Sequence, residues 1–441
     1  MNTNEIDIIT LGCSKNLVDA ERLMYQLTEA GYRCCHDSDD PHGEIAVINT
    51  CGFIGDAKEE SINTILQFAQ RKRKHQLRRL YVMGCLSQRY LSELQKEIPE
   101  VDRFYGKFNF LDLINDLKQD RPGNLTSCQE VFRRTITTPT HYAYLKIAEG
   151  CNRFCSYCAI PIITGRYKSR PIEEIEDEVR WLTSQGVKEL QVIAQDLTNY
   201  GEDLYGENKI AQLIDNISRI PGVEWIRLHY AYPTHFPLDL LRVMRERDNV
   251  CKYLDIALQH SSDHMLSLMH RHITKDEQTQ LINTIRQEVP GIFIRTTLMV
   301  GHPGETPEDF QDLMQYTQTM HFERMGAFAY SDEEGTYCNL HYNDDIPTET
   351  KNERLNRLMD LQQQIAEQVS RQLIGQTLKV IIDREDDDFY YGRTQYDSPE
   401  VDGEVLISKQ KDNLTPLSVG QFYQVRITDS DIFDLYGEVQ Q

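Results

Sequence analysis

The chain has 441 residues, of which 40% are hydrophobic, which is enough apolar material for two or three packed domains. No stretch approaches the roughly 18 consecutive apolar residues of a membrane span, and the acidic amino-terminal segment lacks the positive region of a signal peptide. We therefore expect a cytosolic protein with no membrane partner. The net charge of −22 disfavours general adhesion to a polyanion and favours a basic partner. In a reducing compartment, eleven cysteines indicate metal binding or catalysis rather than disulfide bonds.

In the N-terminal third, short β-rich stretches alternate with longer helical patterns, which predicts an α/β domain with a largely parallel sheet. The predicted strands are residues 6–11, 44–49, 79–83 and 101–105. The predicted helices are residues 18–30, 56–76, 88–97 and 109–118. A basic run at residues 71–79 closes the second helix. We interpret this run as a solvated helix end rather than as a nucleic-acid contact.

One cysteine follows each of the first three predicted strands, beside a glycine that permits a tight turn. These residues, here called the N-terminal triad, are Cys13, Cys51 and Cys85. Because the carboxyl ends of parallel strands share one edge of the sheet, where ligands bind, we expect the three thiols to converge. The triad predicts a metal site, and we favour an iron–sulfur cluster with one open iron. The alternative is three buried cysteines that pack as small hydrophobic residues.

After a Thr- and Pro-rich linker at residues 121–140, the β/α alternation resumes. The predicted strands are residues 142–148, 189–194, 224–229, 253–258, 293–300 and 324–329. The predicted helices are residues 172–185, 209–218, 238–247, 263–269, 275–288 and 307–320. Six such units form most of a TIM-type barrel, whose chemistry lies at the carboxyl ends of its strands.

Three more cysteines follow the first barrel strand at C-x3-C-x2-C spacing. These residues, here called the loop triad, are Cys151, Cys155 and Cys158. Three thiolates can hold three corners of a [4Fe–4S] cube and leave the fourth iron open to a substrate or cofactor. The alternative, a structural zinc site, normally needs four ligands. We interpret the remaining cysteines as structural or incidental: Cys34, Cys35, Cys128, Cys251 and Cys338.

The C-terminal part predicts a helix at residues 349–373 and then a small antiparallel β-barrel. The predicted strands of that barrel are residues 378–383, 390–394, 404–408 and 422–428. Residues 375–441 contain 6 Lys and Arg against 14 Asp and Glu, a net charge of −8. An RNA-binding barrel would normally carry the opposite sign.

The loop triad, with Tyr157 before its last cysteine, resembles the signature of radical S-adenosylmethionine (SAM) enzymes. The whole chain resembles the methylthiotransferases, a radical SAM subfamily. The supporting motifs are residues 11–19, 49–54, 57–62, 84–90, 194–196, 392–394 and 399–403. Within the subfamily, the chain is most similar to the branch that modifies an aspartate of a ribosomal protein. The branch that modifies tRNA usually has Gly-Gln-Asn where this chain has Ala194-Gln195-Asp196, and Asn-Thr-Cys-Ser where it has Cys51-Gly52.

The resemblance implies an α/β protein of three domains: an N-terminal three-cysteine domain (residues 1–120), a partial (β/α)6 radical SAM barrel with its connecting helix (141–374) and a TRAM domain (375–441). It implies two [4Fe–4S] clusters, one on each triad, and SAM bound at the open iron of the loop triad. Tyr157 would lie near the adenine of SAM. Polar residues at or near other strand ends, Gln195, Gln259 and Arg295, would face the cofactor; for each of these three, ordinary strand-end polarity is the alternative.

The activity implied is methylthio transfer to the unactivated β-carbon of an aspartate in small-subunit ribosomal protein twelve, a basic protein. A SAM-derived radical would remove the hydrogen, so no side chain is assigned as an acid or base catalyst. The second cluster would present sulfur, a second SAM would give the methyl group, and an electron donor and a sulfur donor would be needed. Two alternatives remain: a tRNA adenosine methylthiotransferase, disfavoured by the acidic tail, and a non-catalytic iron–sulfur or RNA-binding protein.

Overall fold

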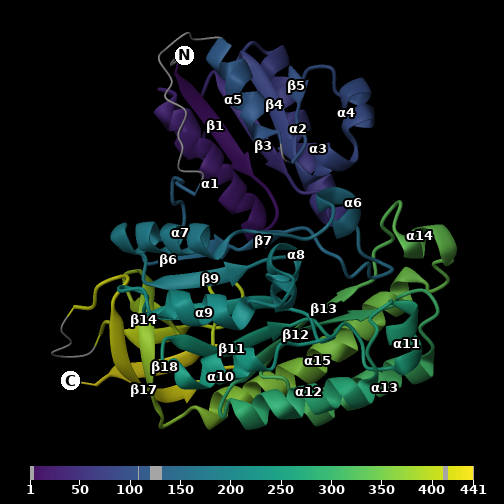
Figure 1. The fold of residues 1–441 in the computed structure, drawn as a ribbon, viewed down its shortest axis with the longest axis vertical. Coiled ribbons are helices and arrows are strands. Elements are labelled where there is room, and N and C mark those ends of the chain that lie inside the picture. The colour runs from purple at the N-terminus through teal and green to yellow at the C-terminus, as the bar shows by residue number, and fades with distance from the viewer. Residues whose placement is uncertain (1–3, 108, 120–131, 411–415, 441) are drawn as a thin grey trace. The chain divides into compact units, whose positions relative to one another are not determined.

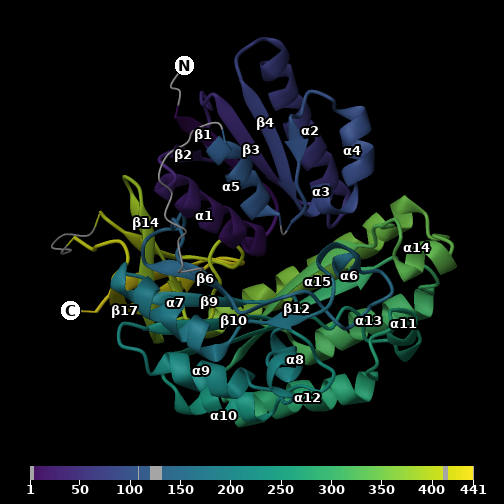
Figure 2. The same cartoon turned by 45° about the horizontal axis from the view of Figure 1, so that its top comes forward.

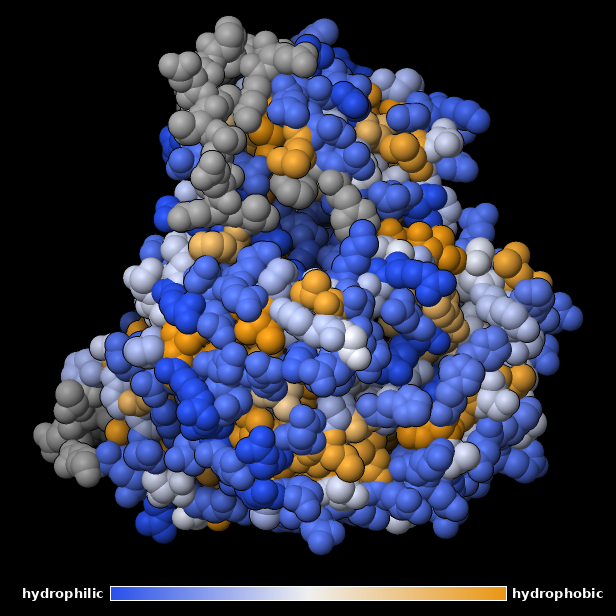
Figure 3. Space-filling view, viewed as in Figure 1, coloured by the Kyte–Doolittle hydropathy of each residue, from blue (hydrophilic) through white to orange (hydrophobic). Residues whose placement is uncertain are grey.

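The computed structural model describes residues 4–107, 109–119, 132–410 and 416–440. The chain divides into two compact units. One is formed by Met1–Thr138, Tyr144–Trp181 and Ser331–Leu340, and the other by Pro139–Ala143, Leu182–Tyr330 and His341–Gln441. Residues 121–131, most of the predicted linker, lie outside the described residues. In the part of the chain that the structure describes, no helix has the length and apolar character needed to cross a membrane. The face drawn in Figure 3 is largely hydrophilic, with separate apolar areas.

The first unit is built on a parallel sheet of strand order β2-β1-β3-β4-β5 (Figure 1). Its strands are β1 (Glu5–Thr10), β2 (Arg33–His36), β3 (Ile45–Thr50), β4 (Arg79–Gly84) and β5 (Arg103–Phe104). Its helices are α1 (Ser14–Glu29), α2 (Gly55–Arg73), α3 (Cys85–Arg89), α4 (Leu91–Glu97) and α5 (Phe110–Gln119). The parallel α/β domain expected from the sequence is therefore confirmed. Strand β2 was not predicted, because the four residues Arg-Cys-Cys-His carry no hydrophobic periodicity.

Two apolar cores lie on the two faces of this sheet. Because successive side chains of a strand point to opposite faces, Val47 packs in the core that α1 and α5 cover, whereas Ile48 packs with α2 and α4. Both views of the fold show this layering (Figure 1 and Figure 2). Because helices cover both faces of the sheet, the central strand Ile45–Thr50 is buried throughout, as is usual for a parallel sheet.

The basic run at residues 71–79 makes structural ion pairs. Lys72 and Arg79 contact the Asp102 carboxylate at 2.5 and 3.0 Å, and Arg73 lies 2.7 Å from Glu100. Arg71, Lys72 and Arg73 also form the last turn of α2, where cations complement the helix dipole. These contacts support the interpretation of the run as a helix end.

The central sheet has the strand order β13-β12-β11-β10-β9-β6, which is the sequential order of a partial (β/α)6 barrel. Its strands are β6 (Tyr142–Lys146), β9 (Glu189–Ile193), β10 (Trp225–Ala231), β11 (Val250–Ile256), β12 (Phe293–Val300) and β13 (Arg324–Ala329). The helices between them include α7 (Ile172–Ser184), α9 (Ile210–Ser218), α10 (Asp239–Glu246), α11 (Asp263–Leu268), α12 (Lys275–Glu288) and α13 (Pro307–Met320). All six predicted strands and helices are present within a few residues of their expected bounds.

Several short elements were not predicted. They are β7 (Ala148–Glu149), α6 (Ile160–Thr164), β8 (Lys168–Ser169), η1 (Leu197–Asn199), α8 (Glu202–Tyr205) and α14 (Tyr337–His341). Each has six residues or fewer, which is too short for a periodic pattern. The antiparallel pair β7–β8 closes the base of the segment that carries the loop triad.

The C-terminal part begins with α15 (Thr348–Gln372) and then forms a closed barrel of strand order β14-β15-β16-β18-β17. The strands are β14 (Thr377–Glu385), β15 (Phe389–Thr394), β16 (Val405–Ser408), β17 (Phe422–Ser430) and β18 (Leu435–Val439). The predicted small barrel is confirmed, with two additions. Strand β18 was missed, since Gly437 interrupts its five residues, and β18 pairs with β16 in parallel, whereas the other pairs are antiparallel.

Buried ion pairs join this barrel to the central sheet within the second unit. Glu189, at the start of β9, is fully buried between Arg227 at 3.0 Å and Arg393 at 2.7 Å. Arg324 likewise reaches Asp397 at 2.6 Å. Arg393 lies within the motif at residues 392–394, so that motif has a structural role in docking the C-terminal barrel.

Candidate metal centres

The N-terminal triad lies at one edge of the first sheet, as the sequence predicted. Cys13 immediately precedes α1, Cys51 directly follows β3, and Cys85 begins α3 directly after β4. The three strands β1, β3 and β4 are neighbours in the sheet, so their carboxyl ends bring the three cysteines together. Cys13 is exposed, whereas Cys51 and Cys85 are buried.

Two glycines make this close approach possible. Gly12 has φ +90°, and a Cβ atom there would lie 2.7 Å from the Cys51 sulfur. Gly84 has φ +101°, and a Cβ atom there would lie 2.5 Å from the carbonyl oxygen of Thr50. At both positions the backbone is left-handed and the space that a Cβ atom would need is already filled. These two constraints explain the Gly-Cys pairs in the sequence.

Asn16 connects the three strand ends. Its side-chain amide donates hydrogen bonds to the carbonyl oxygens of Leu11 and Thr50, both at 3.0 Å, and its Oδ1 atom lies 3.5 Å from the Cys85 sulfur. Asn16 is almost fully buried, at 1% exposure. We did not single it out from the sequence, although it lies within the motif at residues 11–19.

A buried cation, Lys107, stands beside this triad. Its ammonium nitrogen lies 3.9 Å from the Cys85 sulfur, 3.3 Å from Asp19 and 3.5 Å from Glu149. Burial alone would lower the pKa of Lys107, but Asp19, Cys85 and Glu149 raise it well above its usual value. For Asp19, burial would raise the pKa, but Lys146 and Lys107 lower it to about 2. No sequence motif pointed to Lys107.

The thiol pKa values show how the cysteines behave when no metal is bound. Burial raises the pKa of Cys85 to about 12, Lys107 opposes this rise, and nearby Cys13 and Cys51 add to it. Burial also raises the pKa of Cys51. Both thiols are therefore protonated at neutral pH until a metal centre displaces the protons, as metal binding to cysteine requires.

The loop triad lies on a tight loop between β7 and α6. The Cys151 amide donates a hydrogen bond to the Gly165 carbonyl at 3.2 Å, and the Cys158 amide donates to the Cys155 carbonyl at 3.0 Å. The Arg153 amide points toward the Cys151 sulfur, 3.5 Å away. All three cysteines are partly exposed. The loop is therefore ordered by its backbone and leaves the sulfurs accessible to a cluster.

Both triads belong to the first compact unit, and side-chain packing links them. Cys85 of the N-terminal triad packs against Ala159 and Ile163, which follow Cys158 in the chain. Two three-thiol sites therefore share one structural unit.

The donor sets fit iron–sulfur clusters better than a single metal ion. Across the described ranges, no three His, Cys, Asp or Glu side chains are placed so that they could hold one ion. A [4Fe–4S] cluster binds each thiolate at a different iron, so its ligands need not approach one another as the ligands of one ion do. Three cysteines on a glycine-lined cradle meet that requirement at the N-terminal triad, and three cysteines on an ordered loop meet it at the loop triad.

The four residues predicted to contact the cofactor have different surroundings in the structure. Tyr157 is partly buried on the triad loop, and Gln195 follows β9. Gln259 lies just beyond β11, with φ +73°, and its side-chain oxygen is buried with no hydrogen-bond partner among the described residues. An unpartnered buried amide oxygen is suited to a polar ligand. Arg295 lies near the amino end of β12, where its guanidinium contacts Asp402 of the C-terminal barrel at 2.7 Å.

The remaining cysteines show no shared site. Cys34 and Cys35 lie on β2, and Cys251 and Cys338 are buried. Cys128 lies outside the described residues. Burial raises the pKa of Cys251 to about 12, so this thiol is unreactive at neutral pH.

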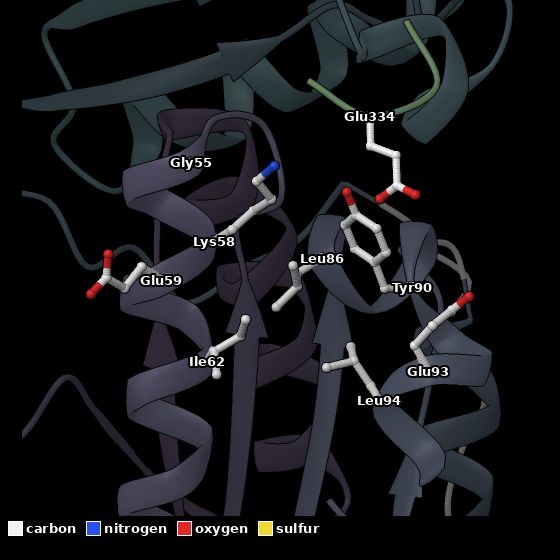
Figure 4. A pocket seen from close by; sticks show the side chains of 9 residues that line it. All are labelled: Gly55, Lys58, Glu59, Ile62, Leu86, Tyr90, Glu93, Leu94 and Glu334. Atoms are coloured by element: carbon white, nitrogen blue, oxygen red, sulfur yellow. The ribbon is translucent and has the colours of Figure 1, made fainter. Parts of the chain in front are cut away.

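A groove of about 470 Å³ opens between α2 and the helices α3 and α4 (Figure 4). Its floor is apolar and contains Ile62, Leu86 and Leu94, while Glu59 and Glu93 stand at its sides. No cysteine lines the groove, although Leu86 directly follows Cys85. The groove is therefore distinct from the triad itself.

Comparison with known proteins defines the class. Residues 5–106 match the model of the uncharacterized protein family UPF0004, residues 145–317 match the radical SAM superfamily, and residues 374–439 match the TRAM domain. The fold is similar to that of a radical S-adenosylmethionine methyltransferase, TsrM, from Kitasatospora setae, with a TM-score of 0.55 and 13% identity over 75% of this chain and 77% of that one. The chain is thus a radical SAM enzyme with a C-terminal TRAM domain, and this class uses a [4Fe–4S] cluster and SAM.

Full-length relatives define the family. The chain is 64% identical to the ribosomal protein uS12 methylthiotransferase RimO of Bacteroides thetaiotaomicron, over 100% of this chain and 99% of that protein. It is 57% identical to the protein of the same name from Porphyromonas gingivalis, over the full length of both. The chain belongs to the family of ribosomal protein uS12 methylthiotransferases.

Proposed function

We propose that this protein adds a methylthio group to the β-carbon of an aspartate of ribosomal protein uS12, in the cytoplasm. The observation that carries the proposal is the presence of two three-cysteine sites in one compact unit of a chain that matches uS12 methylthiotransferases over its full length. A SAM-dependent cluster enzyme of simpler chemistry would not need the second triad. An electron donor and a sulfur donor are required as partners.

The loop triad would hold the cluster that binds SAM, and the N-terminal triad would hold a second [4Fe–4S] cluster that carries the sulfur to be transferred. When bound, SAM and its cluster supply a radical that can remove hydrogen from an unactivated carbon. Each cluster would be held by the three thiolates of its triad. Tyr157, Gln195 and Gln259 are proposed to contact SAM. Arg295 remains a proposed contact, although its ion pair with Asp402 also gives it a structural role.

The C-terminal barrel supports a basic protein as the substrate. Its net charge of −8 includes a run of exposed acidic residues at the turn between β14 and β15, from Glu385 to Asp388. Ribosomal proteins are basic, and opposite charges steer encounter. The same surface would repel a tRNA backbone.

The proposed division of the chain is an N-terminal three-cysteine domain, a linker, a radical SAM barrel with its connecting helix and a TRAM domain. Their bounds are residues 1–120, 121–140, 141–374 and 375–441.

A competition experiment tests this function. The reconstituted, reduced protein is given SAM and sulfide under anaerobic conditions together with uS12 and unmodified tRNA, and both are analysed by mass spectrometry. We expect a methylthio mass gain on one aspartate of uS12 and none on the tRNA. A gain on the tRNA alone would overturn the proposed substrate, and failure to cleave SAM would overturn the catalytic assignment.

A further inference from the structure

Lys107 is held at a fixed position beside the N-terminal triad. Its backbone amide donates a hydrogen bond to the Gln88 side chain at 3.1 Å, and its own side chain is only 3% exposed. Its ammonium group has polar neighbours on three elements: Asp19 and Asn16 on α1, Glu149 on β7 and Cys85 at the start of α3. A buried lysine with this many partners has one orientation, so its charge is fixed in place.

The charges around Lys107 form a balanced group of four. Lys146 contacts the same two carboxylates, Asp19 and, at 2.9 Å, Glu149. Two lysines and two carboxylates sum to zero, which explains how four charges can be buried together. Lys107 is the member of the group that touches a cysteine sulfur, at 3.9 Å. The neutral group therefore presents a positive charge to the N-terminal triad.

The same group connects the two triads along the chain. Glu149 lies two residues before Cys151, the first cysteine of the loop triad, and Lys107 contacts both Glu149 and Cys85. One ammonium group thus contacts a cysteine of one site and the segment that leads into the other.

We propose that Lys107 is a positioning residue that places a fixed positive charge against the cluster of the N-terminal triad and raises its reduction potential. A nearby cation stabilises the reduced, more negative cluster over the oxidised one, and contacts to cluster sulfurs are known to set the potential. This inference rests on the proposed second cluster.

The test uses the full chain with the loop triad replaced by alanine, so that only the N-terminal cluster can form. In this background, Lys107→Met, Lys146→Met and Glu149→Gln are compared for iron and sulfide content and for the midpoint potential, titrated by electron paramagnetic resonance. Lys146→Met is the matched control, because it removes the same charge from the same group of four while leaving Lys107 against Cys85.

We expect Lys107→Met to shift the potential downward, Lys146→Met to shift it clearly less, and Glu149→Gln to shift it upward because a negative charge is removed. Equal effects of the two lysine variants, or a cluster of unchanged potential in Lys107→Met, would overturn it. A background protein that binds no iron would overturn the second cluster and this role together. Equal effects of the two lysine variants, or an unchanged potential in Lys107→Met, would leave the proposed function intact.

Discussion

Removing the charge of Glu189 should loosen the C-terminal barrel from the central sheet. Glu189 is fully buried between Arg227 and Arg393, and Glu189→Gln keeps the shape of the side chain. Burial would raise the pKa of Glu189, but Arg393 and Arg227 lower it to about 2 from the usual 4.5. At 1.36 kcal/mol per pH unit, this difference corresponds to about 3 kcal/mol of stability. Truncating one partner of a buried ion pair costs a similar amount, about 3–5 kcal/mol.

The sign of the pH dependence follows from the lowered pKa. The carboxylate is charged in both states above about pH 4.5, so its full contribution is present there, and the contribution is lost as the pH falls toward about 2. The difference between wild type and Glu189→Gln should therefore be constant near neutral pH and shrink below about pH 4.5.

The assay can follow this interface directly. Trp225 of β10 packs edge-on against Phe422 of the C-terminal barrel, with ring centroids 4.8 Å apart. In a Trp181→Phe background, urea unfolding followed by tryptophan fluorescence reports on this contact. The matched control is Glu224→Gln, which breaks an exposed pair with Lys379 across the same interface and should cost no more than about 1 kcal/mol. If Glu189→Gln cost no more than Glu224→Gln, the reasoning would be refuted.

Two further substitutions test the cradle of the N-terminal triad. Gly84→Ala should lower iron binding at this triad and destabilise the protein by more than ~2 kcal/mol, because its Cβ would collide with Thr50 from a left-handed backbone. The control is Gly206→Ala, at a position with φ +75° and open space around it. This control should cost only about 1 kcal/mol in the same thermal-unfolding and iron assays. Asn16→Ala should cost about 1–3 kcal/mol, because the buried carbonyl of Thr50 loses its side-chain partner. An Asn16→Ala protein with wild-type melting and iron content would show that this side chain does not organise the site.

Hydrophobic periodicity was sufficient to predict the longer elements. The buried strand Ile45–Thr50 and the helix Lys275–Glu288 carry patterns long enough to recognise, and the placement of Cys51 at a strand end followed from them. Strands β2 and β18 were missed, because four or five residues with polar or glycine positions give no period.

Polar contacts between distant residues could not be predicted in this way. Lys107 meets Asp19 and Glu149 only after folding, and no spacing rule links these positions. That Arg295 faces the cofactor stays a prediction, and the sequence did not show that Asp402, far along the chain, would meet its guanidinium. The loop triad was recognisable because its spacing is local, and the N-terminal triad because each of its cysteines follows a predicted strand.

The most direct test of the whole account compares the wild type with a variant whose N-terminal triad is replaced by alanine. In one anaerobic reaction with uS12, both 5′-deoxyadenosine and the methylthio mass gain are quantified. The account predicts that the wild type gives both products, whereas the variant still cleaves SAM but transfers no methylthio group. Methylthio transfer by the variant would contradict the account, because the second cluster would then have no part in the reaction.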